Sequence, residues 1–425
     1  MKEYDILIIG GGPAGLSAAR MSAGLNQKTV LLEKLSKPGE LGHPCSGAIG
    51  PLPDFVSGQR RMEGLYYPEI DLFIPESLVI GKPLVQKFIA PSGDYFEARF
   101  PDRDDFPIAV IDKPGLLRLL AEQAQISGVE LRYGTPVLEL VRENGRIVGV
   151  RTSREELRAR LIISAEGFSR QFSEEAGVYE NISDKKRYAF IVSQELEAPA
   201  ALAEHVSQIS TMGRRYTSVY PSFGTVVVPT SGRVSVYFTI YSDTPHLGLG
   251  ESLWHILDEY KSDPRISYLL DGAQVLSQSG CRIVIRSTPP NVVRDGFISI
   301  GDAVGPGGHV GIIPCIYLGK QAAQIAAQAL QEGNISAARL GEYNRICQGP
   351  ILHGLDSEAR IITSLSEMED EQMDHLCQML TQMNLAPFFY GEWKPIVSDT
   401  LRWFITRFPF ILRDWRMIQR ILKPL

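Results

Sequence analysis

Three glycines and one acidic residue near the N-terminus have the types and the spacing of a nucleotide-binding site. Gly10, Gly12 and Gly15 follow the apolar run "DILII", and Glu33 ends a second apolar run, "TVLLE". In this pattern the first glycine permits a tight turn, the second lets the backbone approach a pyrophosphate, and the third lets a helix lie close to a strand. An acid at the end of the second strand accepts hydrogen bonds from ribose hydroxyls. The sequence therefore predicts a strand, a glycine turn, a helix and a second strand that bind a dinucleotide.

A second glycine-rich segment follows much later in the chain. Gly301 and Asp302 end a predicted strand, and a long helix of small and aliphatic residues is predicted to begin at about Gly311. This segment resembles the FAD-contacting GD motif of the para-hydroxybenzoate-hydroxylase-like flavoproteins, in which the aspartate meets the ribityl chain. The resemblance implies that FAD is the dinucleotide. It also implies that the helix N-terminus at Gly311 and Ile312 stabilises the negative charge that develops on the reduced flavin.

Two further matches to the same superfamily lie between these motifs. The segment "SAEGFS" resembles the superfamily's A-D-G element, with Glu166 where aspartate is usual. Lys113 directly precedes a predicted helix that opens at Pro114, and it stands where an arginine usually contacts the cofactor. The resemblance implies that further cofactor contacts come from Ala14, Lys34, Cys45, Ser46 and Val137.

The order of the predicted elements indicates an α/β fold with two lobes and a helical tail. Runs rich in β-branched and aromatic residues, such as "VVVPTSGRVSVYFTIY", are broken by Ser-Gly turns and predict an antiparallel sheet. In related flavoproteins such a sheet covers the isoalloxazine ring. We therefore predict a discontinuous, Rossmann-like FAD-binding domain, a mostly antiparallel substrate domain and a C-terminal helical region. These comprise residues 1–60, 101–180 and 281–335, residues 61–100 and 181–280, and residues 336–425, respectively.

Three segments narrow the resemblance further. They are Pro44-Cys45-Ser46-Gly47, the Gly311-Ile312 junction and the proline-spaced segment from Pro221 to Pro229. Together they resemble the geranylgeranyl reductase family, including the archaeal digeranylgeranylglycerophospholipid reductases. The last segment has the proline spacing of the family's P-x-x-Y-x-W-x-F-P pocket motif, but glycine and valine replace the aromatics, which would widen an apolar pocket. The resemblance thus implies that an isoprenoid lipid or a prenylated small molecule is bound by Pro221, Val226, Val228 and Pro229.

Cys45 lies in the segment that crosses the flavin in this family. Reduction of an isolated double bond needs a hydride at one carbon and a proton at the other. Cys45 and His309 are the two candidate proton donors in the sequence. The alternative for Cys45 is a small apolar residue whose backbone contacts the cofactor, because free cysteines are commonly inert packing residues.

These features predict an FAD-dependent reductase that saturates carbon–carbon double bonds of a geranylgeranyl-type lipid by hydride transfer. No second G-x-G-x-x-G motif follows a predicted strand, so the sequence predicts no dedicated NAD(P)H domain, and a reduced carrier protein or transiently bound NAD(P)H would supply the electrons. One alternative is an FAD-dependent monooxygenase of an aromatic or polyprenylated substrate, and another is an FAD-binding redox protein without enzymatic activity. A halogenase is disfavoured because the sequence has no W-x-W-x-I-P motif.

The net charge and the cysteine content indicate which binding partners and which cellular compartment to expect. The net charge of −6 and the pI near 5.8 argue against non-specific binding of nucleic acid. The five cysteines include no C-x-x-C pair, which argues against a disulfide framework and a zinc site and favours the cytoplasm. The basic and aromatic segment 401–425 has two interpretations: an amphipathic helix on the inner face of the membrane, or a helix packed on the FAD-binding domain.

Overall fold

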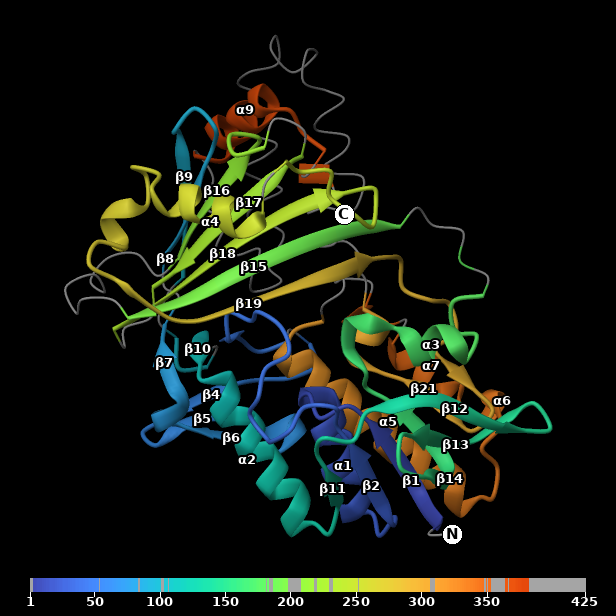
Figure 1. Cartoon of the computed structure of the whole chain (residues 1–425). Coiled ribbons are helices and arrows are strands. Elements are labelled where there is room, and N and C mark those ends of the chain that lie inside the picture. The colour runs from blue at the N-terminus through green and yellow to red at the C-terminus, as the bar shows by residue number, and fades with distance from the viewer. Residues whose placement is uncertain are drawn as a thin grey trace, which may run out of the picture.

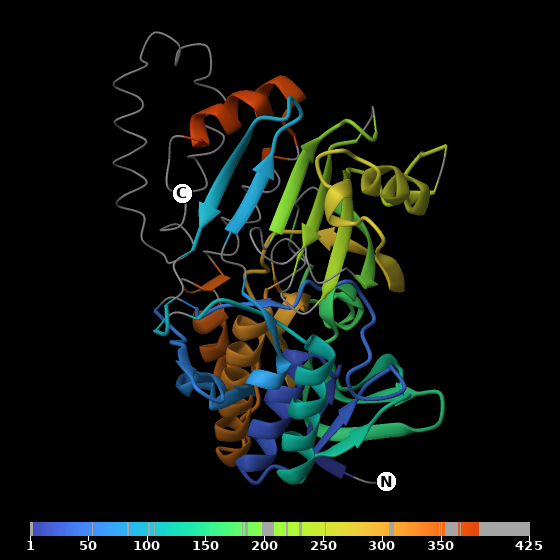
Figure 2. The same ribbon diagram turned by 90° about the vertical axis from the view of Figure 1, so that its left-hand side faces the viewer.

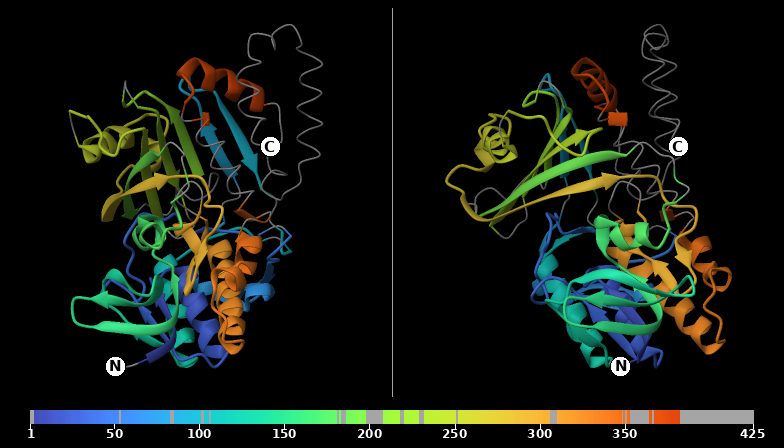
Figure 3. Two further views of the ribbon diagram at one scale, coloured as in Figure 1. Left: turned by 90° about the vertical axis from the view of Figure 1, so that its right-hand side faces the viewer. Right: turned by 45° about the vertical axis from the view of Figure 1, so that its right-hand side comes forward.

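The molecule has a lower α/β lobe and an upper lobe formed by a large sheet that arches over it (Figure 1). The two views in Figure 3 show the same separation of the lobes from other sides. The computed structural model describes residues 3–52, 54–82, 85–100, 103–105, 107–180, 182, 186–197, 208–217, 220–228, 232–250, 252–305, 310–347, 349, 351–352, 364–365 and 367–381.

The lower lobe is built around an eight-stranded mixed sheet. Its strand order is β11-β2-β1-β14-β13-β12, and β21 pairs with both β14 and β20. The pairings of β11, β2, β1, β14 and β21 are parallel, and the others are antiparallel. The apolar run of β1 is buried, as expected for a strand that is covered on both faces. The strands are β1 (Glu3–Ile9), β2 (Thr29–Leu32), β11 (Glu130–Arg132), β12 (Val137–Glu143), β13 (Arg146–Thr152), β14 (Glu156–Ser164), β20 (Val293–Arg294) and β21 (Phe297–Ser299).

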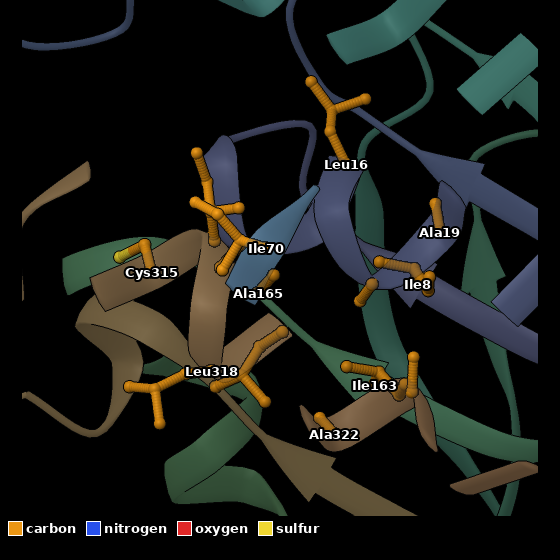
Figure 4. Packing of buried hydrophobic residues seen from close by; sticks show 14 of the residues in the cluster. Ile8, Leu16, Ala19, Ile70, Ile163, Ala165, Cys315, Leu318 and Ala322 are labelled. Carbon is orange, nitrogen blue, oxygen red and sulfur yellow. The ribbon is translucent and has the colours of Figure 1, made fainter. Parts of the chain in front are cut away.

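Three helices lie side by side against this sheet (Figure 2): α1 (Pro13–Gly24), α2 (Lys113–Ile126) and α5 (Ile312–Gln331). Helices α1 and α5 approach closely because their contact is made of small residues. A Cβ atom on Gly319 of α5 would lie 2.3 Å from the carbonyl oxygen of Ala14 in α1. Figure 4 shows side chains of this core, among them Ile8, Ile163 and Ala322. The sequence patterns predicted the positions of α1 and α5 correctly.

Two small sheets complete the lower lobe. They are β3 (Ala48–Ile49), β10 (Ala109–Ile111) and β7 (Val79–Gly81), and β4 (Gln59–Arg61), β5 (Gly64–Tyr67) and β6 (Leu72–Pro75) with the adjoining 3-10 turns η1 (Pro68–Ile70) and η2 (Glu76–Leu78). Leu65 and Ile74 pack in the same core as Ile6 of β1. The lower lobe therefore extends past residue 61, where the sequence analysis placed the boundary, because a local strand pattern does not say which core its apolar face joins.

The upper lobe is a seven-stranded sheet, antiparallel except for the parallel pair β16 and β8. In spatial order its strands are β19 (Gln274–Ile285), β15 (Arg187–Glu197), β18 (Arg233–Ser242), β17 (Ser222–Val227), β16 (Gln208–Gly213), β8 (Val85–Ile89) and β9 (Tyr95–Arg99). The predicted α/β fold with a mostly antiparallel second sheet is thus confirmed.

Two helices cover parts of this sheet from different sides. Helix α4 (Leu253–Lys261) packs on alternate residues of β18, which include Val236 and Phe238. Because successive side chains of a strand point to opposite faces, Ser235 and Tyr237 point away from α4, toward the lower lobe. Helix α9 (Asp370–Leu380) packs on the end of the sheet formed by β8, β9 and β16.

The remaining helical elements are short. They are α3 (Gln171–Glu175), α6 (Ala337–Leu340), α7 (Glu342–Cys347) and the 3-10 turns η3 (Gly167–Ser169), η5 (Ser267–Leu269) and η6 (Gly301–Ala303). Helices α6, α7 and α9 agree with the helical character predicted after residue 335. Over the described part of the chain, no helix has the length and apolarity needed to cross a bilayer. The segment 401–425 lies outside the described residues.

Candidate functional site

The glycine turn between β1 and α1 is closed by contacts that only glycine allows. Gly10 has a φ of +103°, and a Cβ atom there would lie 2.3 Å from the carbonyl oxygen of Ala165. A Cβ atom on Gly15 would lie 1.9 Å from the carbonyl oxygen of Gly10. These two glycines hold the first turn of α1 against β1 and β14. They have the roles in turn and packing that their spacing predicts.

Gly12 is needed for a different reason. It is the N-cap of α1, and a Cβ atom on it would meet no protein atom within 4 Å. Its missing side chain therefore leaves open space in front of the unpaired N–H groups at the helix N-terminus. Such an end binds phosphate through backbone N–H groups and the helix dipole. This open cradle fits the pyrophosphate of a dinucleotide.

Glu33 lies directly after β2, beside the glycine turn. Its buried carboxylate accepts hydrogen bonds from the backbone N–H of Gly11 at 2.5 Å and of Leu35 at 2.8 Å. The carboxylate is thus fixed at the strand end, where an acid in this fold meets a ribose. The predicted contact residue Lys34 directly follows Glu33 in the chain. The backbone N–H of Thr135 donates to the Glu33 carbonyl, and this bond brings the nearby predicted contact residue Val137 to the same strand end. Lys34 is exposed.

The second predicted motif forms a compact turn between β21 and α5. Gly301 has a φ of +65°, and its Cβ position lies 3.1 Å from the Cβ atom of Ala14. Asp302 accepts a hydrogen bond from the backbone N–H of Val310 at 2.8 Å. Gly311, with a φ of +93°, is the N-cap of α5, so the helix begins at Ile312 as predicted. The structure thus brings this motif against the first turn of α1.

Two further titratable residues, His309 and Cys315, follow Asp302 in the sequence. Cys315 is buried in the core of the lower lobe, with its sulfur 3.8 Å from Asp302 Oδ1. Burial and the Asp302 carboxylate raise the pKa of this thiol well above its usual value, as expected of a packing residue. His309 lies outside the described residues, so its role as a proton donor stays a prediction.

The Cys45 segment is held beside the start of α2 by one glycine. Gly47 has a φ of +70°, and a Cβ atom there would lie 2.4 Å from the carbonyl oxygen of Ile111. Its own carbonyl accepts from the backbone N–H of Ile111 at 2.9 Å. Ser46 is partly buried and accepts a hydrogen bond from the backbone N–H of Ala48. Cys45, a partly buried free thiol, is thereby fixed in place.

Three titratable residues from distant segments lie close enough to influence one another's charge at this loop. Lys113, at the start of α2, is only 8% exposed, and over the described residues it has no ion-pair partner. Burial lowers the pKa of His43 from its usual value. The charges of Lys113 and Lys34 also lower it, while Asp302 and the hydrogen bond to the Pro44 carbonyl oppose the shift. His43, Lys113 and Asp302 therefore lie within electrostatic range of one another. A buried cation without a protein anion fits the negative charge of a phosphate or a reduced flavin.

Glu166 has a structural task. Its carboxylate accepts from the backbone N–H groups of Phe172 at 2.9 Å and Ser173 at 2.7 Å, and so caps the N-terminus of α3. Burial raises the pKa of Glu166, while these hydrogen bonds oppose the shift. The next loop is tied down by Arg170, which is 1% exposed and donates to the carbonyl of Gly305 at 2.5 Å.

The underside of the upper sheet brings a further acid and phenol toward Cys45. Tyr237 of β18 donates a hydrogen bond to Glu195 of β15 at 3.5 Å, and Ser235 donates to the same carboxylate at 2.6 Å. Cys45 lies near enough to contribute to the raised pKa of Tyr237. Cys45 of the lower lobe is therefore within electrostatic range of Tyr237 of the upper lobe.

Two of the predicted pocket residues lie on the other face of this sheet. Val226 and Val228 are buried in the cluster beneath α4. Gly224 shares their face, and a Cβ atom on it would lie 2.2 Å from the ring of Tyr260, which fills that space. We therefore remove Val226 and Val228 from the pocket, and the argument that small residues widen it fails. Pro221 lies directly before β17, and Pro229 is outside the described residues.

The comparisons with known proteins agree with this geometry. Two family models, both described as FAD dependent oxidoreductase, match residues 5–170 and 104–312. The digeranylgeranylglycerophospholipid reductase of Thermoplasma volcanium is 22% identical over 401 residues, which cover 91% of this chain and 93% of that protein.

Two solved structures show the same fold. A geranylgeranyl bacteriochlorophyll reductase-like protein from Thermoplasma acidophilum superimposes with a TM-score of 0.76 at 20% identity, covering 98% of this chain and 99% of that one. The myxobacterial chondrochloren halogenase CndH gives a TM-score of 0.60 at 14% identity, covering 87% and 84%. Identities this low establish the fold alone.

The glycine turn, the Asp302 turn and the family matches define this chain as an FAD-dependent oxidoreductase with FAD as its cofactor. The predicted cofactor and enzyme class are thus confirmed. Within this class the chain resembles the geranylgeranyl reductases along almost its whole length, which confirms the predicted resemblance.

The sequence analysis missed three residues of the site: His43, Glu195 and Tyr237. His43 had a usable signal, because it lies two positions before Cys45 in the same predicted loop. The other two had none. Glu195 and Tyr237 become neighbours only through the pairing of β15 with β18, in which Glu195 lies opposite Ser235.

Proposed function

We propose that this protein reduces carbon–carbon double bonds of an isoprenoid lipid or a prenylated small molecule. The observation that carries the proposal is the extent of the similarity. Relatives named digeranylgeranylglycerophospholipid reductase align with both lobes, over 91% of this chain in one case and 97% in another. A shared FAD-binding lobe alone would not favour one substrate class over another.

The described residues support a proposal for how the cofactor is held. Gly12 and the N-terminus of α1 would receive the pyrophosphate, Glu33 the adenosine ribose and Asp302 the ribityl chain. Lys113 would offset negative charge on the cofactor. When bound and reduced, FAD supplies the hydride for one carbon of the double bond. The protein must then provide a proton donor for the other carbon.

The underside of the sheet bears on the kind of substrate. Next to Tyr237 it carries hydroxyl groups, and the hydroxyls of Ser193 and Ser279 lie 3.0 Å apart on β15 and β19. This polar surface fits a substrate that has a polar group attached to its prenyl chain. These hydroxyls already bond to each other within the protein, and they keep the surface polar for such a group.

An anaerobic experiment tests the proposal. The flavin of the purified protein is reduced chemically, a geranylgeranyl glycerophospholipid or a prenyl quinone is added, and flavin reoxidation is followed together with product mass. Reoxidation without oxygen, with a gain of two hydrogens per double bond, is the expected result. Reoxidation only after oxygen is admitted, with an oxygen atom in the product, would identify a monooxygenase instead. No turnover with any of these lipids would favour a redox protein.

The electron donor and the membrane contact are tested separately. We propose that a reduced carrier protein or NAD(P)H reduces the flavin, and that segment 401–425 rests on an anionic membrane surface. Anaerobic mixing with NADH or NADPH distinguishes the two donors by the rate of flavin bleaching. Flotation of the full chain, and of a chain ending at residue 400, with vesicles of anionic phospholipid tests the segment.

A further inference from the structure

An acid, a phenol and a hydroxyl form a connected group on the underside of the upper sheet. Glu195 Oε1 lies 3.5 Å from the Tyr237 hydroxyl, and Glu195 Oε2 lies 2.6 Å from the Ser235 hydroxyl. Strand pairing fixes the arrangement, because Glu195 of β15 lies directly opposite Ser235 of β18. The carboxylate is therefore positioned by two donors from the neighbouring strand.

The direction of this group follows from its neighbours in the strands. Gln194, the residue before Glu195, accepts a hydrogen bond from Lys261 of α4 at 2.7 Å. Glu195 must then point to the opposite face, which is turned toward the lower lobe (Figure 1). On that side Tyr237 lies within electrostatic range of Cys45. The group therefore faces the segment that crosses the flavin in the related family.

The surroundings shift the pKa values of both titratable members of the group upward. Burial, and then the Glu195 carboxylate and Cys45, raise the pKa of Tyr237 well above its usual value. Burial also raises the pKa of Glu195, while the hydrogen bonds from Ser235 and Tyr237 and the charge of Arg233 oppose the shift. A raised pKa in a carboxyl group makes it a proton source nearer to neutral pH.

We propose that Tyr237 is the catalytic residue that delivers the proton for double-bond reduction, and that Glu195 is the positioning residue that returns a proton to it. This inference rests on the proposed function. The hydride brings both electrons to one carbon, and the O–H bond of Tyr237 breaks as a C–H bond forms at the other. In the same step Glu195 transfers its proton to the tyrosine oxygen, and Glu195 is afterwards reprotonated by water. The alkene is reduced, the flavin is oxidised, and the protein ends unchanged.

Rapid mixing of the reduced holoenzyme with a geranylgeranyl glycerophospholipid tests the donor. Tyr237→Phe should slow anaerobic flavin reoxidation about 100-fold while FAD content stays normal, because the ring remains and the proton is lost. Tyr241→Phe is the matched control, since it removes a hydroxyl from the same face of the same strand, and its rate should stay within about twofold of the unmodified protein. The assignment would be overturned if the Tyr237→Phe rate stayed within twofold of the unmodified protein. It would also be overturned if Cys45→Ala slowed the reaction as much as is expected for Tyr237→Phe.

Glu195→Gln separates positioning from packing. In the unmodified protein the rate constant for reoxidation should fall as the pH rises through the pKa of Glu195, because the carboxyl group then loses the proton that it returns. The groups that face it are Tyr237, Ser235 and Arg233. Glu195→Gln should be slower by about tenfold and should lack this fall. An unchanged pH profile in the variant would exclude Glu195.

A readout that does not need turnover keeps this inference separate from the proposed function. In the FAD-loaded protein with ¹³C-labelled tyrosine, the resonance lost in Tyr237→Phe is assigned to Tyr237, and its titration is followed. Glu195→Gln should lower the pKa of Tyr237, because a negative charge beside the phenol is removed. No shift would refute the Tyr237–Glu195 pair. A coupled pair in a protein that reduces no prenyl lipid would refute the proposed function and, with it, proton delivery to such lipids.

Discussion

The glycines of the turn between β1 and α1 differ from the single glycine of β17 in how far the sequence alone predicts their role. Gly10 and Gly15 lie in one turn and contact each other, since a Cβ atom on Gly15 would lie 1.9 Å from the carbonyl oxygen of Gly10. Gly224 contacts Tyr260, a residue of another element. The role of the first pair follows from spacing along the chain. The role of Gly224 depends on which element covers its face of the sheet.

The largest effect on stability is expected from a substitution that breaks the glycine turn itself. Gly15→Val would place methyl groups against the carbonyl of Gly10, and we expect a loss of more than about 3 kcal/mol of stability with little soluble protein. Gly24→Ala, at the other end of α1, is the control, because its Cβ position has no atom within 4 Å. Soluble yield and thermal melting measure both. A Gly15→Val protein that melts like the unmodified one would contradict the packing role.

Gly12 separates folding from cofactor binding within the same turn. Gly12→Val adds a side chain where no protein atom lies within 4 Å, so the fold should survive while FAD is displaced. We expect the purified variant to be colourless, with its affinity for added FAD weakened at least 100-fold, or about 2.7 kcal/mol. Circular dichroism and flavin fluorescence report the two properties independently. Retention of FAD at full occupancy would show that the pyrophosphate lies elsewhere.

A substitution at Gly224 tests whether this glycine of β17 serves packing against α4 or lines the substrate pocket. Gly224→Ala should cost about 1–3 kcal/mol because the new methyl group meets the ring of Tyr260, but it should leave the KM for lipid unchanged. Gly250→Ala, with open space at its Cβ position, controls for the loss of glycine. Melting temperature and lipid kinetics are measured on both variants. A change in KM without a change in melting would return Gly224 to the substrate pocket.

Substitutions of Lys113 test how much the buried positive charge contributes to FAD affinity. Lys113→Met removes the buried cation and should weaken FAD binding about tenfold, while Lys113→Arg should keep most of the affinity. The dissociation constant of the apoprotein for FAD, measured by fluorescence quenching, separates the two variants. Equal affinities for all three proteins would mean that Lys113 contributes only packing.

The smallest expected effect is the pH dependence that comes from His43. Because burial lowers its pKa in the folded protein, the unfolded chain takes up a proton more readily below the usual value near 6.5. His43 therefore contributes stability above that pH, and this contribution is lost as the pH falls. His43→Gln should show a smaller drop in melting temperature between pH 7.5 and pH 5.5. An identical drop would assign the acid sensitivity to other groups.

Much of the lower lobe could be predicted because its site is assembled from residues that are close in the chain. The turn from Gly10 to Gly15, the acid at Glu33 and the helix start at Ile312 all depend on local backbone geometry. The boundary near residue 61 was placed wrongly, since β5 and β6 have strand patterns but join the core of β1. Their strand character was local information, and their packing partner was not.

The sequence by itself determined the nucleotide turn, the order of the strands and helices, and the fact that Gly224, Val226 and Val228 share one face. Only the tertiary structure decided that this face is buried under α4, and that the opposite face brings Glu195 and Tyr237 toward Cys45. The physical reason is that a strand's alternation of side chains has a period of two but no absolute direction. The direction is set by the element that covers one face, and α4 follows β17 and β18 in the chain.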